Sequence, residues 1–360
     1  MKKKVLLLGI AIVFHFLPAQ SLADAEKFLI CGDDWYQSKP AISGDTVVWF
    51  DQRGNNDGSG KEIYGKKLMG QEFDVSPSTY EQYWPDISGN IVVWREYRDN
   101  NWDIFYKNLI TNQEFKASSI VGEKDYPSVS NNIIIWDDRG SGGIRAFDII
   151  NDVEFSILNY NMGMGEPDID DNIVVWQDWR NLGSGNLDIY GYNIQTDTEF
   201  SICTDISSQL DPAISGNIVV WEDSRNGGYD IYGKNISTGQ EFPVCIASGN
   251  QSDPAISGDF VVWLDRRSGS SEVYGKNLVT GEEFPIATGP GGNIYPDISN
   301  NIVVWSEGAG DIYGADISDL ICFSKPLSDV NNDCKVDLLD LAIFCSEWLT
   351  CGHVDTNVCW

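Results

Sequence analysis

Residues 212–245 read PAISGNIVVWEDSRNGGYDIYGKNISTGQEFPVC, and residues 254–286 read PAISGDFVVWLDRRSGSSEVYGKNLVTGEEFPI. The same motif occurs seven times between residues 40 and 318, and each copy has one tryptophan at the end of an apolar run. The seven tryptophans follow one another at intervals of 40 to 45 residues: Trp49, Trp94, Trp136, Trp176, Trp221, Trp263 and Trp305. A period of this length indicates a repeat architecture.

Each copy predicts four short strands. In residues 212–245 these are PAIS, then IVVW after a Gly-Asn turn, then DIYGKNI, and then EFPV after a Thr-Gly turn. The IVVW run does not alternate with polar residues, so both of its faces must be covered. A β-propeller meets this demand because each four-stranded blade packs between two others. We therefore predict an all-β fold, a seven-bladed β-propeller of four-stranded blades over residues 27–319.

The chain offers two ways to close the ring. The segment KFLIC at residues 27–31 matches the fourth strand EFPVC, while the seventh copy ends in a shortened DLICF. We expect Phe28–Ile30 to supply the outer strand of the seventh blade, because closure removes free sheet edges. In the alternative, Leu320–Phe323 fills that position and Phe28–Ile30 forms an extra edge strand.

The order of strand, proline, turn, apolar strand, D-x-R, DIY and NL-x-TG resembles the TolB-type propeller repeat over residues 28–318. The resemblance implies the fold and says little about function, because propellers host many unrelated activities. The repeated D-x-R element is expected to be structural. We expect its arginine to pair with the aspartate of DIYG or with a turn carbonyl.

Positions that differ between the copies are the candidates for a binding site. The residue before each proline is Lys39, Trp84, Tyr126, Glu166, Asp211, Asp253 or Tyr295, and amides stand two residues earlier at Gln37, Gln82, Gln209 and Gln251. If PAIS is the inner strand, these side chains enter the central channel at one mouth. Aromatic rings, acids and amides together suit a sugar. The alternative is that they only plug the channel.

Catalysis is the second hypothesis. A glycosidase needs only two carboxylates at a suitable separation, and the chain has 54 acidic residues. Residues 27–319 contain no histidine, which excludes the histidine-bound metal chemistry that a resemblance to propeller-fold pectate lyases would imply. A close pair of buried carboxylates in the channel would favour an enzyme, and a fully plugged channel would argue against one.

The N-terminus and the charge predict where the protein works. Residues 1–23 have three lysines, a short apolar run and small residues at cleavage points, as in a secretory signal peptide. No later run is long enough to span a membrane. The net charge of −30 repels nucleic acid and anionic membranes. We expect a secreted protein, extracellular, on the cell surface or periplasmic, that binds neither.

Residues 329–340 read DVNNDCKVDLLD and have the oxygen spacing of a Ca²⁺-binding loop. The predicted ligands are Asp329, Asn331, Asp333, the carbonyl of Lys335, Asp337 and Asp340. An amphipathic helix is expected next, in LLDLAIFCSEWL. This pattern resembles a type I dockerin repeat, which implies a calcium-loop–helix module over residues 320–360 and a cohesin-like or surface partner.

This module departs from a dockerin in two ways. Cys334 stands where the turn prefers glycine, and only one repeat is present where a dockerin has two. Its four last cysteines, at 334, 345, 351 and 359, allow three disulfide pairings. We predict a secreted, non-catalytic binding or display protein, whose propeller recognises a glycan or protein and whose calcium-loaded tail attaches it. The alternatives are a polysaccharide-acting glycosidase or accessory factor, and a structural repeat protein without a ligand.

Overall fold

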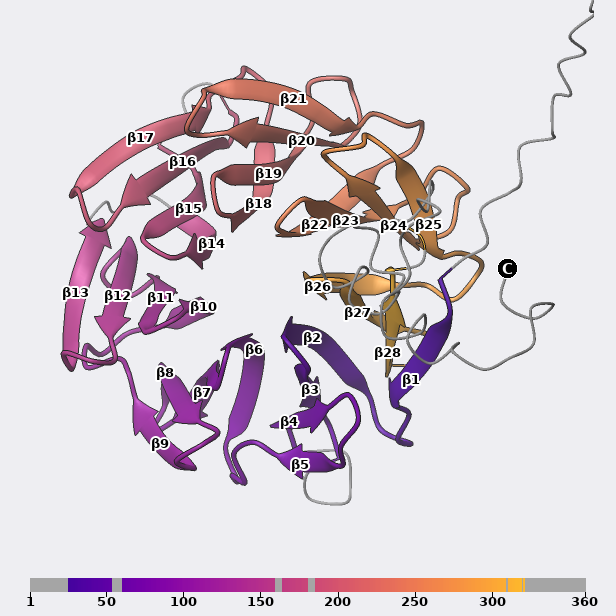
Figure 1. Cartoon of the computed structure of the whole chain (residues 1–360). Helices are drawn as coiled ribbons and strands as arrows, with labels where there is room; N and C mark the ends of the chain where they lie inside the picture. The colour runs from indigo at the N-terminus through magenta and orange to yellow at the C-terminus, as the bar shows by residue number, and fades with distance from the viewer. Residues whose placement is uncertain are drawn as a thin grey trace, which may run out of the picture.

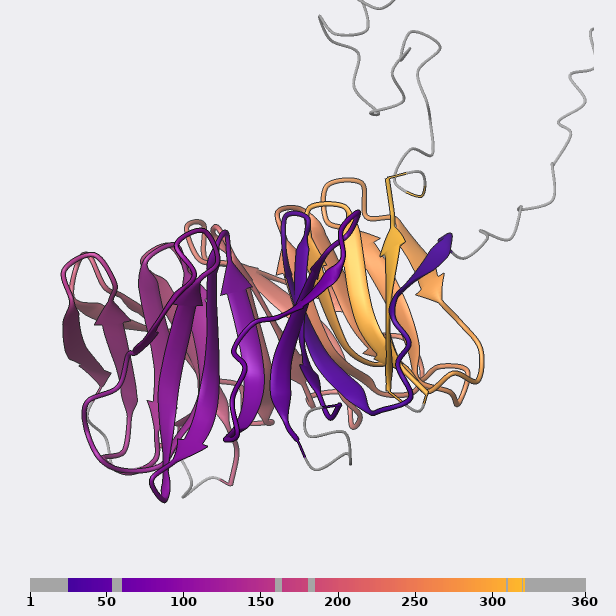
Figure 2. The same cartoon turned by 90° about the horizontal axis from the view of Figure 1, so that it is seen from below.

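The computed structural model describes residues 25–53, 60–158, 164–180, 185–308, 310–318 and 320. In these ranges the chain forms seven antiparallel sheets of four strands each. The sheets stand side by side around a central axis (Figure 1), and the view from the side shows them as one disc of blades (Figure 2). The predicted all-β, seven-bladed propeller is therefore confirmed.

Every blade has the strand order of the sequence motif. The strands nearest the axis are β2 (Gln37–Ser43), β6 (Glu81–Ser88), β10 (Lys124–Ser130), β14 (Met164–Asp170), β18 (Gln209–Ser215), β22 (Gln251–Ser257) and β26 (Ile294–Ser299). The second strands are β3 (Thr46–Asp51), β7 (Ile91–Arg98), β11 (Ile133–Asp138), β15 (Ile173–Asp178), β19 (Ile218–Asp223), β23 (Phe260–Asp265) and β27 (Ile302–Glu307).

The outer half of each blade completes the sheet. The third strands are β4 (Glu62–Lys67), β8 (Asn101–Asn108), β12 (Ile144–Asp148), β16 (Asp188–Asn193), β20 (Asp230–Asn235), β24 (Glu272–Asn277) and β28 (Asp311–Asp316). The outermost strands are β5 (Glu72–Asp74), β9 (Gln113–Lys116), β13 (Val153–Leu158), β17 (Thr198–Cys203), β21 (Gln240–Cys245), β25 (Glu283–Ala287) and, in the seventh blade, β1 (Lys27–Cys31).

The N-terminal strand closes the ring. β1 pairs antiparallel with β28, and the sheet order of the seventh blade is β1-β28-β27-β26. The inner strands β26 and β2 also contact each other, as neighbouring inner strands do elsewhere in the ring. The expectation that Phe28–Ile30 supplies the outer strand is confirmed, and the alternative that Leu320–Phe323 fills this position is wrong.

The hydrophobic core lies between the blades. The tryptophans of the seven second strands are all fully buried. On β7, Val92 packs into the cluster shared with the first blade, while Val93 packs into the cluster shared with the third. Both faces of the apolar strand are thus covered, which is why its sequence shows no polar alternation.

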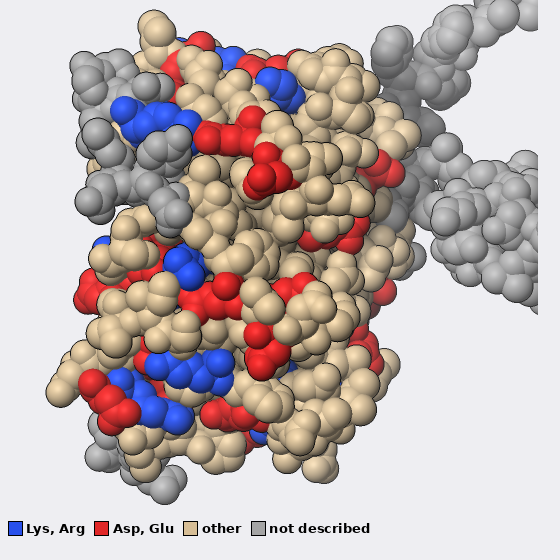
Figure 3. Space-filling view, turned by 90° about the vertical axis from the view of Figure 1, so that its left-hand side faces the viewer, with Lys and Arg blue, Asp and Glu red and all other residues tan. Residues whose placement is uncertain are grey.

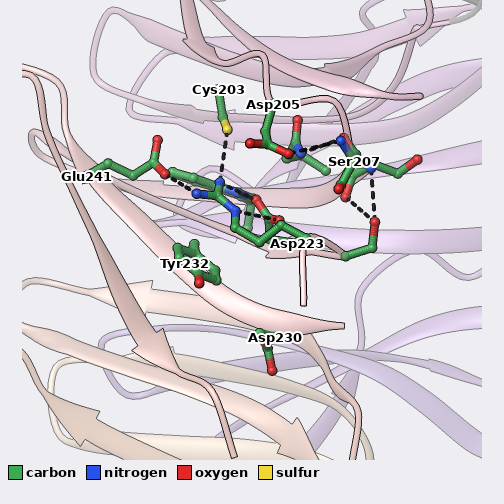
Figure 4. A network of polar contacts seen from close by, with 12 residues as sticks. Cys203, Asp205, Ser207, Asp223, Asp230, Tyr232 and Glu241 are labelled. Carbon is green, nitrogen blue, oxygen red and sulfur yellow. Dashed lines mark hydrogen bonds and ion pairs between the residues drawn. The ribbon is translucent and has the colours of Figure 1, made fainter. Parts of the chain in front are cut away.

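The D-x-R motif of the first, fifth and sixth blades contacts the outer strand of the blade before it. In the fifth blade, Trp221 Nε1 and Arg225 Nη2 donate to Asp223 at 2.9 and 2.6 Å. Arg225 also contacts Glu241 of its own outer strand at 2.6 Å and Cys203 Sγ of the preceding blade at 3.4 Å (Figure 4). The motif is structural. Its arginine pairs with the aspartate two residues earlier, so our prediction of the DIYG aspartate as partner is wrong.

Charges on the rim are interspersed by sign. The side shown in Figure 3 carries basic and acidic side chains next to one another. In the third blade, for example, Arg145 donates to Glu154 at 2.6 Å. Such pairing limits the mutual repulsion that a net charge of −30 would otherwise produce.

The two ends of the chain lie outside the described residues. This holds for the signal peptide predicted at residues 1–23 and for the calcium-loop–helix module predicted over residues 320–360, of which only residue 320 is described. Among the residues that the structure describes, no helix is long and apolar enough to cross a membrane.

Candidate functional site: the channel pocket

A left-handed residue precedes the proline of every inner strand. Their φ angles lie between 48° and 54°, at Lys39, Trp84, Tyr126, Glu166, Asp211, Asp253 and Tyr295. At each of these positions the pairing with the second strand shifts register, as between Ser38 and Ala41. The proline that follows has no N–H for the ladder, and it lies on an edge strand where that loss is tolerated. The inner strand therefore bulges toward the axis at one level of all seven blades.

The seven side chains line a single pocket, here called the channel pocket. Its volume is about 350 Å³. Its lining consists of the seven left-handed residues, four of the prolines and one further acid: Lys39, Trp84, Pro85, Tyr126, Pro127, Glu166, Pro167, Asp168, Asp211, Pro212, Asp253 and Tyr295. The residues before the prolines thus converge on the channel, as the sequence predicted.

One half of the channel pocket is aromatic and holds a lysine. The Lys39 ammonium lies 3.8 Å from the centre of the Trp84 ring and 3.6 Å from that of Tyr295. The Trp84 and Tyr126 rings are 4.8 Å apart and tilted by 56°. Burial lowers the pKa of Lys39 to about 8, although Asp211 and Asp253 partly offset this effect. The aromatic faces stabilise the ammonium by cation–π attraction.

The other half is acidic and comes from three consecutive blades. Asp211 and Glu166 form a side-chain hydrogen bond with each other. Burial and the nearby Glu166 carboxylate raise the pKa of Asp211 well above its ordinary value. Asp211 therefore keeps its proton to a higher pH than an ordinary aspartate does.

Glu222 lies behind this acidic half. Its Oε1 accepts the backbone N–H of Asp253 at 2.8 Å. Burial, together with the charges of Asp253 and Glu166, raises the pKa of Glu222 to about 7, even though that hydrogen bond acts in the opposite direction. The acidic half thus holds more carboxyl groups than one lysine can neutralise.

The predicted amides do not lie in the channel pocket. Gln37, Gln82, Gln209 and Gln251 are fully buried and are not part of its lining. Gln82 accepts the N–H of Ile63 from the first blade at 3.0 Å and donates to Glu96 at 2.8 Å. In a regular strand, residues two apart share a face. The left-handed residue that follows breaks that alternation. Gln82 therefore joins two blades, whereas the side chains of Gln37, Gln209 and Gln251 each donate to the carbonyl two residues earlier.

Three carboxylates were not predicted from the sequence. Asp86, Asp168 and Asp297 follow the proline in three inner strands, and each accepts the N–H of its own next residue and one from the next blade. The Asp168–Ile214 hydrogen bond, for example, is 2.9 Å long. Burial raises the pKa of Asp168 and of Asp297 to about 7. The signal was the change from PAIS to PDIS at Asp86 and Asp297 and to PDID at Asp168.

The described residues contain no group of three or more His, Cys, Asp or Glu side chains arranged to hold a metal ion. The predicted calcium ligands Asp329, Asn331, Asp333, Lys335, Asp337 and Asp340 lie outside these residues. The cysteines of the propeller that the structure describes, Cys31, Cys203 and Cys245, are buried thiols without a disulfide.

A second recess lies apart from the channel pocket, at the tip of the β7–β8 hairpin. Its volume is about 380 Å³, and it is lined by Glu81, Tyr97, Asn100, Asn101, Trp102 and Glu123. The Tyr97 and Trp102 rings are 5.0 Å apart. The Arg95 guanidinium lies 4.2 Å from the centre of the Trp102 ring.

Comparisons with known proteins identify the fold. Of three similar solved structures, one is a puromycin-hydrolysing peptidase from Mycobacterium tuberculosis, with a TM-score of 0.61 and 10% identity, and the match covers 76% of this chain and 50% of that chain. The second is an oligogalacturonate lyase from Vibrio parahaemolyticus, with a TM-score of 0.59, 11% identity and coverage of 82% and 99%. The third is TolB from Acinetobacter baumannii, with a TM-score of 0.50, 16% identity and coverage of 73% and 65%.

These similarities support the TolB-like propeller that the repeat motif predicted. This chain spans about half the length of the peptidase, and all three identities are low, so the similarities concern the fold alone. No family model matches the chain. No curated protein matches it either.

Proposed function

We propose that this chain is an exported binding protein that recognises a glycan or protein ligand in the channel pocket. The observation that carries the proposal is the convergence of seven different side chains from seven equivalent left-handed positions. An αL conformation costs a residue with a Cβ roughly 1–2 kcal/mol, and Asn or Gly is the usual occupant. Here Trp, Tyr, Lys and Glu occupy five of these positions, which supports selection for what their side chains bind.

The character of the pocket supports a neutral or cationic ligand. Flat rings on one side offer stacking surfaces for the C–H face of a sugar, and carboxyl groups on the other side accept hydroxyl protons. The excess of carboxyl groups repels an anionic chain such as a polyuronate. We therefore do not propose an anionic oligogalacturonate as the ligand of this protein.

The second candidate is a polysaccharide-acting enzyme or accessory factor. The Glu166–Asp211 pair favours it, because Asp211 with its raised pKa can serve as a proton donor beside a second carboxyl group. However, two hydrogen-bonded carboxyl groups are closer than the roughly 5–5.5 Å of retaining and 6.5–9.5 Å of inverting glycosidases. This pair alone lacks the spacing of a glycosidase site, and binding without catalysis remains our first proposal.

The tail is proposed to carry one Ca²⁺ and to attach the protein to a cohesin-like or surface partner. The support is the oxygen spacing of residues 329–340 and its resemblance to a dockerin repeat. The loop's ligands Asp329, Asn331, Asp333, Asp337 and Asp340 are hard oxygen donors, as Ca²⁺ prefers. The propeller would then display its channel pocket at the place where the tail is held.

The experiment is a parallel screen of the mature full chain with calcium present, on a glycan array and on soluble polysaccharides assayed for hydrolysis. Our proposal expects binding to at least one neutral or amine-bearing glycan and no new reducing ends. Release of product would replace it with the enzyme. Failure to bind any glycan would restrict the ligand to a protein or leave a purely structural role.

A further inference from the structure

The carboxylates of the acidic half of the channel pocket have no close ion pair among the described residues. Among the described residues, no lysine or arginine nitrogen lies within 4.0 Å of the Glu166, Asp211 or Asp253 carboxylates, although such ion pairs occur throughout the rest of the propeller. The one lysine of the pocket is held by the Trp84 and Tyr295 rings instead. Lys39 therefore acts on these half-buried carboxylates only by longer-range attraction, and the pocket has more carboxyl groups than cationic groups.

A proton on Asp211 lowers the negative charge of this acidic half. Asp211 is hydrogen-bonded to Glu166, and Glu166 also has a side-chain hydrogen bond with Tyr126. Desolvation and the neighbouring Glu166 make Asp211 harder to ionise, so its raised pKa favours the protonated form. A ligand that brings its own positive charge can release this proton and form charge-assisted hydrogen bonds with both groups.

The size and the walls of the pocket limit what this cation can be. A bare metal ion is not favoured, because the described residues hold no group of three side chains arranged to ligate one. A volume of about 350 Å³ beside the tilted Trp84 and Tyr126 rings instead suits a small ring with an apolar face. The cation is therefore expected on a ring that can stack while its charged group reaches Asp211 and Asp253.

We infer that the channel pocket selects a sugar that carries a free primary amine, with its ammonium on Asp211, Glu166 and Asp253 and its ring against Trp84 and Tyr126. This inference rests on the proposed function, because it names the ligand class of the same pocket. The Lys39 ammonium repels such a ligand, whereas the carboxyl groups attract it. Lys39 and the acidic half therefore change the affinity for the amine in opposite directions.

The test is isothermal titration of the full chain with a glucosamine tetramer and with the N-acetylglucosamine tetramer, which lacks the charge. We expect the free amine to bind at least about tenfold more tightly, since one charge-assisted hydrogen bond contributes roughly that factor. Titration in two buffers of different ionisation enthalpy should show release of a proton on binding of the amine, and none with the acetylated sugar.

Two variants of similar size separate charge from folding. Asp211→Asn keeps the side-chain shape, and asparagine tolerates the left-handed backbone of this position. It should reduce the preference for the amine to less than about threefold and abolish the proton release. Lys39→Gln removes a positive charge from the same pocket and should instead increase the preference for the amine over the acetylated sugar several-fold. A thermal melt of each variant confirms that it is folded.

The negative results of these titrations exclude different parts of the proposal. Equal affinity for the two tetramers, or an unchanged preference in folded Asp211→Asn, overturns the amine selectivity while the proposed binding function stands. Binding of lysine-rich peptides but of neither sugar overturns the amino-sugar assignment and indicates a protein ligand. If no glycan and no peptide binds, the proposed function fails together with the inference.

Discussion

At the scale of single residues, Asp265 shows what the repeated D-x-R motif contributes. It is fully buried and accepts hydrogen bonds from Trp263 Nε1 at 3.0 Å and from Arg267 Nη2 at 2.6 Å. Burial alone would raise the pKa of Asp265, but the hydrogen bonds from Arg267 and Trp263 outweigh it and lower the pKa. Its contribution to stability is therefore present above pH 4 and lost as the pH falls through this depressed pKa.

Asp265→Ala should destabilise the propeller by about 1–3 kcal/mol, because it leaves the buried indole N–H of Trp263 without its acceptor and leaves Arg267 only its ion pair with Glu283. Urea unfolding at pH 7 measures the free energy difference. The control is Asp259→Ala, an exposed acid six residues away on the turn before β23, which should change stability by less than about 0.5 kcal/mol. Equal effects of the two substitutions would show that the motif is not structural.

Glu222 should make stability depend on pH in the opposite direction. The pKa of Glu222 is raised to about 7 from an ordinary value of 4.5, so its favourable contribution is complete below pH 4.5 and is lost as the pH rises through 7. Glu222→Gln can still accept the N–H of Asp253 but does not ionise. A tenfold change in proton affinity corresponds to about 1.4 kcal/mol.

We therefore expect Glu222→Gln to match the wild type near pH 4 and to exceed its stability by on the order of 3 kcal/mol above pH 7. Urea unfolding between pH 4 and 8 measures this difference. Glu282→Gln, at an exposed position, is the control and should follow the wild type throughout. A difference between Glu222→Gln and wild type that does not grow with pH would contradict the raised pKa.

At the scale of elements, β1 decides whether the seventh blade is complete. Phe28 lies over Gly314 of β28, where an added Cβ would stand 2.8 Å from its ring. The same aromatic-on-glycine contact occurs between Phe242 and Gly233 in the fifth blade. Phe28 thus takes the place of the outer-strand phenylalanine although it is about 285 residues away in sequence from its partner strand.

Phe28→Ala should lower the free energy of unfolding by about 2–3 kcal/mol, because it removes a ring that packs in the core between the first and seventh blades. Chemical denaturation measures the loss. Leu29→Ala on the same strand is the control, since Leu29 is 53% exposed and should be nearly neutral. A neutral Phe28→Ala would mean that the ring does not depend on this strand.

The strands could be predicted from the sequence because seven copies repeat the same apolar spacing and the same turns. The bulge in the inner strands could not, because a left-handed residue before proline is set by packing around the axis and leaves no fixed residue type. Strand alternation therefore placed Gln82 in the channel, whereas it contacts Ile63 and Glu96 between blades. The variable residues such as Trp84 were predictable because their difference between copies is visible in the sequence.

At the scale of the whole molecule, the propeller is proposed to bind the ligand, and the tail is proposed to bind Ca²⁺ and attach the protein. Asp329→Ala combined with Asp333→Ala should abolish the binding of one Ca²⁺ by the full chain, because it removes two carboxylate ligands of the loop. Isothermal titration with calcium measures the stoichiometry. Asp355→Ala, beyond the loop, is the control and should leave it unchanged. Stoichiometric binding retained by the double variant would place any calcium elsewhere.

The ligand of the channel pocket is beyond what sequence alone predicts, because it depends on which side chains face each other across the ring. Lys39 meets Trp84 and Tyr295 from the blades on either side of its own, and Glu166 meets Asp211 from the next blade. The spacing of residues in the repeat predicts how far along the channel axis each side chain lies. Which side chains are neighbours around the ring, and hence the division into an aromatic and an acidic half, is known only from the structure.

The most direct measurement of the central claim is a glycan array probed side by side with wild type, Trp84→Ala and Trp179→Ala. Trp84 lines the channel pocket, while Trp179 is 40% exposed and lies outside its lining. Loss of one stacking ring should weaken binding about tenfold or more in Trp84→Ala, and Trp179→Ala should bind as wild type does. Undiminished binding by folded Trp84→Ala would contradict the assignment of the channel pocket as the ligand site.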